Sequence, residues 1–313
     1  MMPSFGVDQS QPPKTIEDLL GPALLAAMDS LELTSRKVLA GRLHGERRSK
    51  RRGFSIDFAD HRPYVAGDDL RYVDWNVYAR LDALFLKLYL DEEDLSVLLV
   101  LDGTPSMDWG DPSKWTYARR LAMAIGSISL ASRHRVSVAS FSGDGVAQLR
   151  DLRGRGRTAE LGRWLLDREI GSPAAGDELG NALRILAPTR RGRGVAIVLS
   201  DFLGGEDPLP ALRVLGGGGD DLHCLQVLAP QELDPGGQGM TGDVRLEDAE
   251  YGGPREVTVT PALLRAYRAR LDARVQLVRD AAHGCGGTHL AVGSDTDIES
   301  LLLGQLKAGG MVQ

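Results

Sequence analysis

Residues 98–107 read LLVLDGTPSM, an apolar run that ends in one carboxylate and then offers two hydroxyls at alternating positions. A continuous apolar run is typical of a strand that is covered on both faces of a sheet. A second run, VAIVL at 195–199, is followed by Ser200 and Asp201. Parallel strands end at a common edge, where open α/β sheets bind their ligands, so we expect Asp102 and Asp201 to lie close together.

Strands and helices alternate through the C-terminal two thirds of the chain. We expect strands at 96–101, 135–142, 146–149, 194–201, 222–228 and 288–292, and helices at 114–133, 158–168, 179–186, 209–215, 261–282 and 298–306. No helix or strand is predicted in the polar stretch between 229 and 259, and its Gly-rich segment at 234–242 is expected to be a loop. This alternation predicts an α/β fold with a doubly wound, mostly parallel, Rossmann-like sheet.

The N-terminal third is organised differently. Residues 1–14 are polar, carry three prolines and are expected to form a flexible lead-in. Residues 15–94 form an N-terminal helical and β segment, with helices over 15–30 and 31–43 and strands at 54–58 and 84–90. The basic run at 47–52 is interpreted as a solvated loop. The α/β domain then spans 95–313.

Composition excludes several classes of protein. The 43 acidic and 37 basic residues give a formal net charge of -6, so nucleic acid is not an expected partner. Two cysteines, Cys224 and Cys285, are too few for a disulfide framework. The first residues lack the basic start and apolar core of a signal peptide, and no apolar window reaches the roughly 20 residues of a membrane span. We therefore expect a cytoplasmic protein without a membrane span.

The oxygen atoms of Asp102, Thr104 and Ser106 form a ligand set for a hard cation. Carboxylate and hydroxyl oxygens suit Mg²⁺ or Ca²⁺ better than zinc. The alternative is structural, because an Asp at the end of a strand often caps the following helix. We favour the metal site, because Asp102, Thr104, Ser106 and Asp201 together are less easily explained as caps.

Three other chemistries are weaker interpretations. Asp-Gly-Thr also occurs in the haloacid-dehalogenase phosphatases, but their nucleophilic Asp would fall at Val100. His283, Cys285 and His289 offer zinc donors at a spacing that matches no standard finger. The segment GRGRT at 154–158 lacks the lysine and the spacing of a Walker loop.

Asp102-x-Thr104-x-Ser106 with the distant Asp201 resembles the von Willebrand factor A domain and its metal-ion-dependent adhesion site. Thr104 stands for the usual first Ser and keeps the oxygen. The family also supplies a Thr from a Gly-Thr-x-Leu loop, whereas this chain has Gly-Asp-Glu-Leu at 176–179. The resemblance implies one site for Mg²⁺, or for Ca²⁺ or Mn²⁺, with the ligands Asp102, Thr104, Ser106, Asp177 and Asp201.

Asp177 is the departure with a functional consequence. Three carboxylates around one point would repel each other without a cation. An extra carboxylate also reduces the positive charge with which the bound ion attracts an acidic residue of a partner. We therefore expect a metal that acts structurally and recruits acidic ligands poorly.

The upstream segment is similar to the signature of the bacterial domain-of-unknown-function-58 family. The similarity begins at 53–58 (GFSIDF) and continues through Arg62, Tyr64, Asp68, Asp69, Arg71, Asp74, Trp75 and Arg80. These eight residues are either a functional surface or a network of paired charges that docks the N-terminal segment against the sheet, and we favour the network. The resemblance implies partnership with a MoxR-type AAA+ ATPase, for which the protein would serve as an adaptor.

Two classes of function remain. We favour a non-enzymatic protein-interaction module, because no Ser-His-Asp or Cys-His set is evident in the sequence. The alternative is a metal-dependent hydrolase that uses Asp102, Asp177 and Asp201, although such enzymes usually gather more acids or histidines than these three.

Overall fold

The computed structural model describes residues 12–21, 58–89, 95–173, 176–190, 194–204, 206–216, 221–246 and 255–306. The chain divides into two compact units, of which one comprises Met1–Leu43 with Leu95–Gln313 and the other His44–Asp94. Five predicted features fall largely or wholly outside the described residues: most of the lead-in at 1–14, the helix at 31–43, most of the helix at 15–30, the basic run at 47–52 and most of the strand at 54–58.

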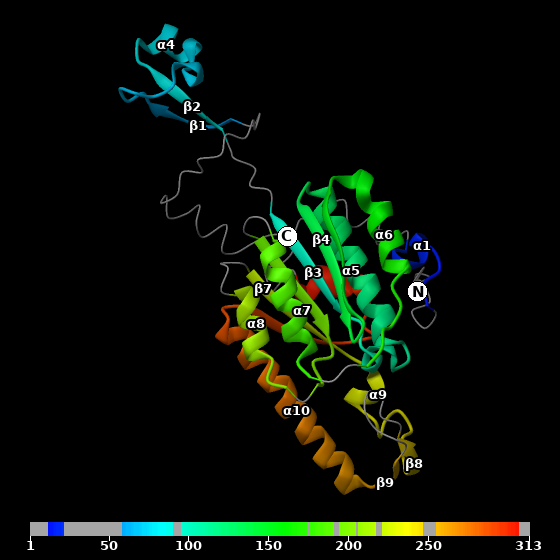
Figure 1. The fold of residues 1–313 in the computed structure, drawn as a ribbon. Coiled ribbons are helices and arrows are strands. Elements are labelled where there is room, and N and C mark those ends of the chain that lie inside the picture. Colours follow the sequence, from blue (N-terminus) through cyan, green and yellow to red (C-terminus); the bar gives the residue numbers. More distant parts are fainter. Residues whose placement is uncertain are drawn as a thin grey trace, which may run out of the picture. The chain divides into compact units, whose positions relative to one another are not determined.

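A six-stranded sheet forms the centre of the large unit (Figure 1). Its strands are β3 (Ser96–Asp102), β4 (Arg135–Ser142), β5 (Gly145–Arg153), β6 (Gly194–Ser200), β7 (Asp221–Leu228) and β10 (Thr288–Gly293). The spatial order is β10-β7-β6-β3-β4-β5, with β5 antiparallel to β4 and the other pairs parallel. Chain connections that start at a central strand and run outward in both directions define a doubly wound sheet, so the predicted fold class is confirmed.

Helices cover both faces of this sheet. They are α1 (Ile16–Leu19), α5 (Lys114–Ala131), α6 (Thr158–Leu166), α7 (Glu178–Leu186), α8 (Leu209–Gly216), α9 (Pro230–Leu233), α10 (Pro261–Gly284) and α11 (Ile298–Ser300), which continues as a π-helix over Leu301–Leu306. Side-chain caps mark the start of five of them, which are α1, α5, α7, α10 and α11. Ser113, Asp177 and Thr260 accept hydrogen bonds from the first-turn amides of α5, α7 and α10.

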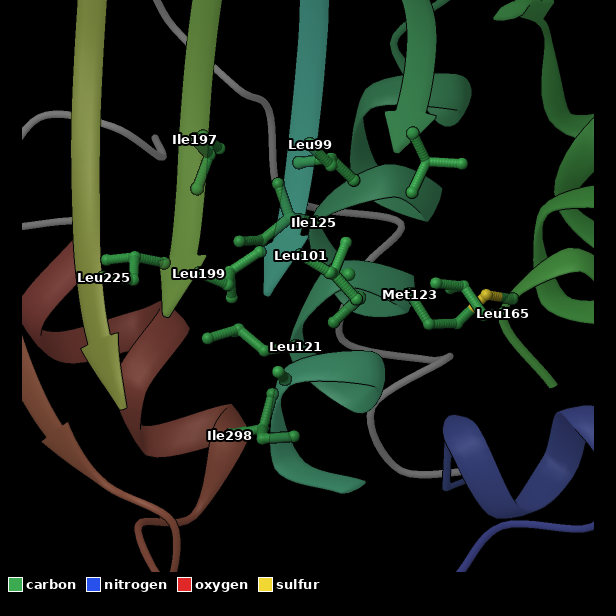
Figure 2. Close-up of a cluster of buried hydrophobic side chains, with 14 of the residues drawn as sticks. Leu99, Leu101, Leu121, Met123, Ile125, Leu165, Ile197, Leu199, Leu225 and Ile298 are labelled. Atoms are coloured by element: carbon green, nitrogen blue, oxygen red, sulfur yellow. The ribbon is translucent and has the colours of Figure 1, made fainter. Parts of the chain in front are cut away.

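The alternation of side chains along β3 divides the core into two layers. Leu99 and Leu101 pack with Ile125 of α5 and Leu165 of α6 on one face, as Figure 2 shows. Leu98 and Val100 belong to the cluster on the other face, which includes residues of α7, α8 and α10. Because both faces are covered, β3, β6 and β7 are buried along their full length, as the continuous apolar runs of β3 and β6 predict.

The short helix α1 packs in the large unit. Leu19 and Leu20 are buried in the same cluster as α5 and α6, and Arg120 donates from Nε to the backbone oxygen of Asp18 at 3.1 Å. A Cβ added to Gly162 of α6 would lie 3.0 Å from Cγ1 of Ile16. The two helices therefore approach each other closely.

The small unit is built on an antiparallel pair, β1 (Phe58–Pro63) and β2 (Phe85–Tyr89). A 3₁₀ turn at Leu70–Tyr72 and the helix α4 (Trp75–Leu81) lie between these strands along the chain. Val73 and Leu86 are its buried apolar residues in the described part.

The stretch between 229 and 259 is the main correction to the predicted fold. The sequence predicts no helix or strand there, only a loop at 234–242, but the stretch contains α9 and a hairpin of β8 (Gly242–Leu246) and β9 (Arg255–Val259). Each strand has five residues, so its alternation is too short to stand out from the glycine-rich sequence around it.

Candidate metal centre

Asp102, Thr104 and Ser106 come together at the end of β3. Oδ1 of Asp102 accepts hydrogen bonds from the backbone nitrogen of Thr104 at 3.0 Å and from its hydroxyl at 2.7 Å. The hydroxyl oxygens of Thr104 and Ser106 lie 3.1 Å apart. A 3₁₀ turn over Pro105–Asp108 places Ser106 on the same side as Thr104. The three oxygen donors thus form one connected group.

Asp102 is buried, and its environment disfavours the charged carboxylate. Burial and the neighbouring charge of Asp201 raise the pKa of Asp102 to about 7, against the opposing effect of its hydrogen bonds. Ser200, at the end of β6, donates from its hydroxyl to Oδ2 of Asp102 at 2.5 Å. Ser200 directly precedes Asp201 but was not predicted as a residue of the site.

Asp201 is held by a buried lysine. Lys114 Nζ lies 2.7 Å from Oδ2 of Asp201 and 2.6 Å from Oε1 of Glu232, and the lysine side chain is 1% exposed. Burial lowers the pKa of Lys114, but the two carboxylates more than offset it, so the pKa is raised and the group stays charged. Sequence reasoning missed Lys114 and Glu232, because 118 positions separate them along the chain.

Asp177 takes a structural role in the described geometry. Its Oδ1 accepts from the amide of Gly180 at 2.7 Å and so caps α7, while its Oδ2 lies 3.3 Å from Arg184. Among the described residues, no three His, Cys, Asp or Glu side chains lie close enough together to hold one ion. The expectation that Asp102, Asp177 and Asp201 surround a single point is therefore corrected.

All five predicted ligands nevertheless line one cavity of about 280 Å³. Its lining contains six acidic side chains and one basic side chain, and the acids are Asp102, Asp177, Glu178, Asp201, Glu206 and Asp207. The basic residue is Arg274 of α10, which donates to the backbone oxygens of Phe202 and Glu206. Arg274 was also missed by sequence reasoning.

The donor set at this cavity is compatible with a hard cation. Two carboxylates, from Asp201 and Glu232, share the single ammonium of Lys114, and the charge of Asp201 also acts on the buried Asp102, which leaves the cluster short of positive charge. A divalent ion beside Asp102 would reduce its repulsion with Asp201, and the neighbouring donors are all oxygens. Asp102, Thr104 and Ser106 are the residues that would hold the ion, with Asp201 next to them.

The other predicted residues lie elsewhere. His289 Nε2 lies 3.0 Å from the amide oxygen of Gln226, so it takes part in the hydrogen bonding of the sheet. Burial lowers the pKa of His289 to about 4. His283, Cys285 and His289 all belong to the described residues, and they do not form a metal site there.

The signature residues belong to the small unit, where several of them form pairs of opposite charge. Arg62 binds Asp68 through two hydrogen bonds of 2.7 Å, and Arg71 pairs with Asp69 at 2.6 Å. Asp74 caps α4 and contacts His61 at 2.9 Å and Lys87 at 3.5 Å. Tyr64 is half-buried, whereas Trp75 and Arg80 are exposed.

The charge pairing expected for this network is therefore present in part.

The doubly wound sheet and the group of Asp102, Thr104 and Ser106 together define a von Willebrand factor A-like domain. Its Asp-x-Thr-x-Ser motif lies at the end of β3, the first strand of this sheet along the chain. The family model "Protein of unknown function DUF58" matches residues 60–277. The chain belongs to this family, as the resemblance predicted.

Several relatives were found. Uncharacterized protein Rv1480 of Mycobacterium tuberculosis is 29% identical over 289 residues, which cover 91% of this chain and 90% of that protein. Uncharacterized protein MAV169 of Mycobacterium avium is 31% identical over 122 residues, or 38% of this chain and 69% of that protein. The solved structure of BatB from Bacteroides thetaiotaomicron has a TM-score of 0.44 and 15% identity, covering 69% of this chain and 98% of that one.

No helix in the described part of the chain combines the length and the apolar character that crossing a bilayer requires.

Proposed function

We propose that this protein is a non-enzymatic protein-interaction module that carries a variant metal-ion-dependent adhesion site. The observation that carries the proposal is the connected oxygen set of Asp102, Thr104 and Ser106, which opens on an acidic cavity beside Asp201. In this proposal the site takes one Mg²⁺, Ca²⁺ or Mn²⁺ ion. The bound ion supplies positive charge at the cavity.

In this proposal the residues around the ion have different roles. Thr104 and Ser106 supply neutral oxygens, and Asp102 supplies the negative charge that favours a cation. Ser200 fixes the orientation of the Asp102 carboxylate through its hydrogen bond to Oδ2. Lys114 holds Asp201 in place and neutralises part of its charge.

We further propose that the protein acts as an adaptor for a MoxR-type AAA+ ATPase in the cytoplasm. The family resemblance supports this partner, and two free cysteines, Cys224 and Cys285, are compatible with a reducing compartment. The test is co-purification of the full-length chain with the MoxR-type ATPase encoded in the same genome, with and without EDTA.

Isothermal titration with Mg²⁺ tests the site itself. We expect saturable binding to the wild type and its loss in Asp102→Ala. Asp167→Ala is the control, because Asp167 is exposed and lies outside the cavity lining. Equal Mg²⁺ affinity of wild type and Asp102→Ala would refute the metal site.

The competing hydrolase makes a different prediction. It requires turnover of phosphate esters or nucleic acid with Mg²⁺ or Mn²⁺, and Asp102→Ala must abolish that turnover. Such a result would replace the adaptor by an enzyme that uses the same cavity.

A further inference from the structure

The first half of α10 makes few contacts with the body of the large unit. The buried residues of this 24-residue helix begin only at Leu271, and every residue from 261 to 270 is exposed or half-buried. Figure 1 shows the first turns of α10 and the β8–β9 hairpin extending away from the central sheet. Within the described part of the chain, this segment is therefore largely exposed.

The exposed half of α10 is basic. Residues 261–270 read PALLRAYRAR, with arginines at 265, 268 and 270 and no acidic residue. In the described part of the chain, the side chains of Arg265, Arg268 and Arg270 form neither a hydrogen bond nor an ion pair. By contrast, Arg274 and Arg279, in the second half of the helix, both bind partners within the chain.

Two of these arginines border a cavity of about 180 Å³ between α10 and the residues that follow α9. Its apolar wall includes Leu233, Leu264 and Tyr267. The charged residues of its lining are Arg265, Arg268 and Asp234. Leu233 is 39% exposed although its side chain is apolar. The cavity thus combines an apolar wall with two guanidinium groups and one carboxylate, and in the described part of the chain neither guanidinium forms an ion pair.

We propose that this surface docks an acidic segment of a partner protein, with an apolar side chain in the cavity and carboxylates paired with Arg265 and Arg268. Charge complementarity carries the choice of partner, because arginine forks bind carboxylates in pairs of hydrogen bonds. The N-terminal end of α10 adds partial positive charge on the same side. None of the cavity's residues lines the metal-site cavity, so the proposal does not depend on a bound ion.

The test uses the full-length chain and a fluorescein-labelled peptide, EEDFLEE, in fluorescence anisotropy. We expect saturable binding that weakens with added salt and that Arg265→Glu/Arg268→Glu reduces at least tenfold. Leu264→Ala tests the apolar wall separately and is expected to weaken binding several-fold. Circular dichroism before each titration shows whether α10 is retained.

Matched controls separate this site from the rest of the molecule. Arg279→Glu reverses a charge on the packed half of the same helix, and Asp167→Ala removes an exposed charge outside both cavities; in buffer that contains EDTA, both are expected to bind the peptide as the wild type does. Equal affinity of wild type and Arg265→Glu/Arg268→Glu overturns the proposal, as does a failure of the peptide to bind. Tighter binding of a single-stranded oligonucleotide than of the peptide would also overturn it.

Discussion

The ammonium group of Lys114 lies 2.7 Å from Oδ2 of Asp201, so the acid that follows β6 is neutralised from within the protein. The same ammonium binds Glu232, which in turn accepts a hydrogen bond from the amide of Ala229 through Oε2. One lysine therefore connects the metal-site edge of the sheet, the start of α5 and the helix α9.

Replacing Lys114 by Met is expected to destabilise the protein strongly. The change leaves Asp201 and Glu232 buried without their shared cation, which costs about 3–5 kcal/mol in comparable buried pairs. Urea denaturation measures the loss. Adding Glu232→Gln to Lys114→Met removes one of the uncompensated charges, so the double variant is expected to be more stable than the single one. A double variant less stable than Lys114→Met would contradict this account.

Asp177→Thr tests whether the extra carboxylate weakens capture of acidic ligands. Thr can still cap α7 through its hydroxyl, so the fold is expected to be retained, whereas Asp177→Ala loses the cap at a cost of about 1 kcal/mol. We expect Asp177→Thr to bind Mg²⁺ with altered affinity and to bind a glutamate-containing peptide more tightly when Mg²⁺ is present. Unchanged Mg²⁺ affinity together with unchanged peptide binding would refute the idea.

The central sheet could be predicted from the sequence, because the pattern that indicates each strand lies within the strand itself. Continuous apolar runs mark β3 and β6, and such a run can be recognised without knowing which residues lie beside it in space. The hairpin of β8 and β9 was not predicted, because its five-residue strands depend on pairing with each other. Short strands carry too few residues for alternation to be recognised.

The site was predicted only in part, for a related reason. Asp102, Thr104 and Ser106 are neighbours in sequence and interact as expected. Lys114 and Glu232 reach Asp201 from 87 and 31 positions away, and no spacing rule indicates such contacts. Asp177 illustrates the opposite error, because its local role as a helix cap accounts for its position without a shared ion.

Arg71 and Asp74 were both expected to stabilise the signature segment. In the structure they differ in burial, so we expect different effects on stability. The Arg71 side chain is 73% exposed and pairs with Asp69 only two positions away, so Arg71→Ala is expected to leave the melting temperature nearly unchanged. Asp74 is buried and caps α4, so Asp74→Ala is expected to destabilise the small unit. Hydrogen exchange of the α4 amides in the full-length variants distinguishes the two; equal protection in both variants would contradict the assignment.

The small unit is also expected to lose stability in acid because of Asp74. The hydrogen bond from His61, aided by the Asn76 and Val77 amides and by Lys87, lowers the pKa of Asp74 to about 2. An unfolded Asp takes up its proton near pH 4, so the stability contributed by Asp74 is complete above pH 4 and declines as the pH falls towards 2. Exchange rates of the Asn76 and Val77 amides, corrected for intrinsic exchange, measure this decline. Asp74→Asn keeps a capping oxygen and removes the titration; an equally steep decline in that variant would exclude Asp74 as its cause.

Leu20→Ala tests whether α1 is an integral part of the large unit. Leu20 is fully buried in the cluster that contains α5 and α6, and truncating a buried leucine costs about 2–5 kcal/mol through lost apolar contact and the resulting cavity. Glu17→Ala is the matched control on the same helix, because Glu17 is exposed. Urea denaturation of the full-length chain should show a clear loss for Leu20→Ala and almost none for Glu17→Ala. If α1 contributed nothing to the core, both variants would unfold at the urea concentration of the wild type, and the close approach of Ile16 to Gly162 would have no energetic significance.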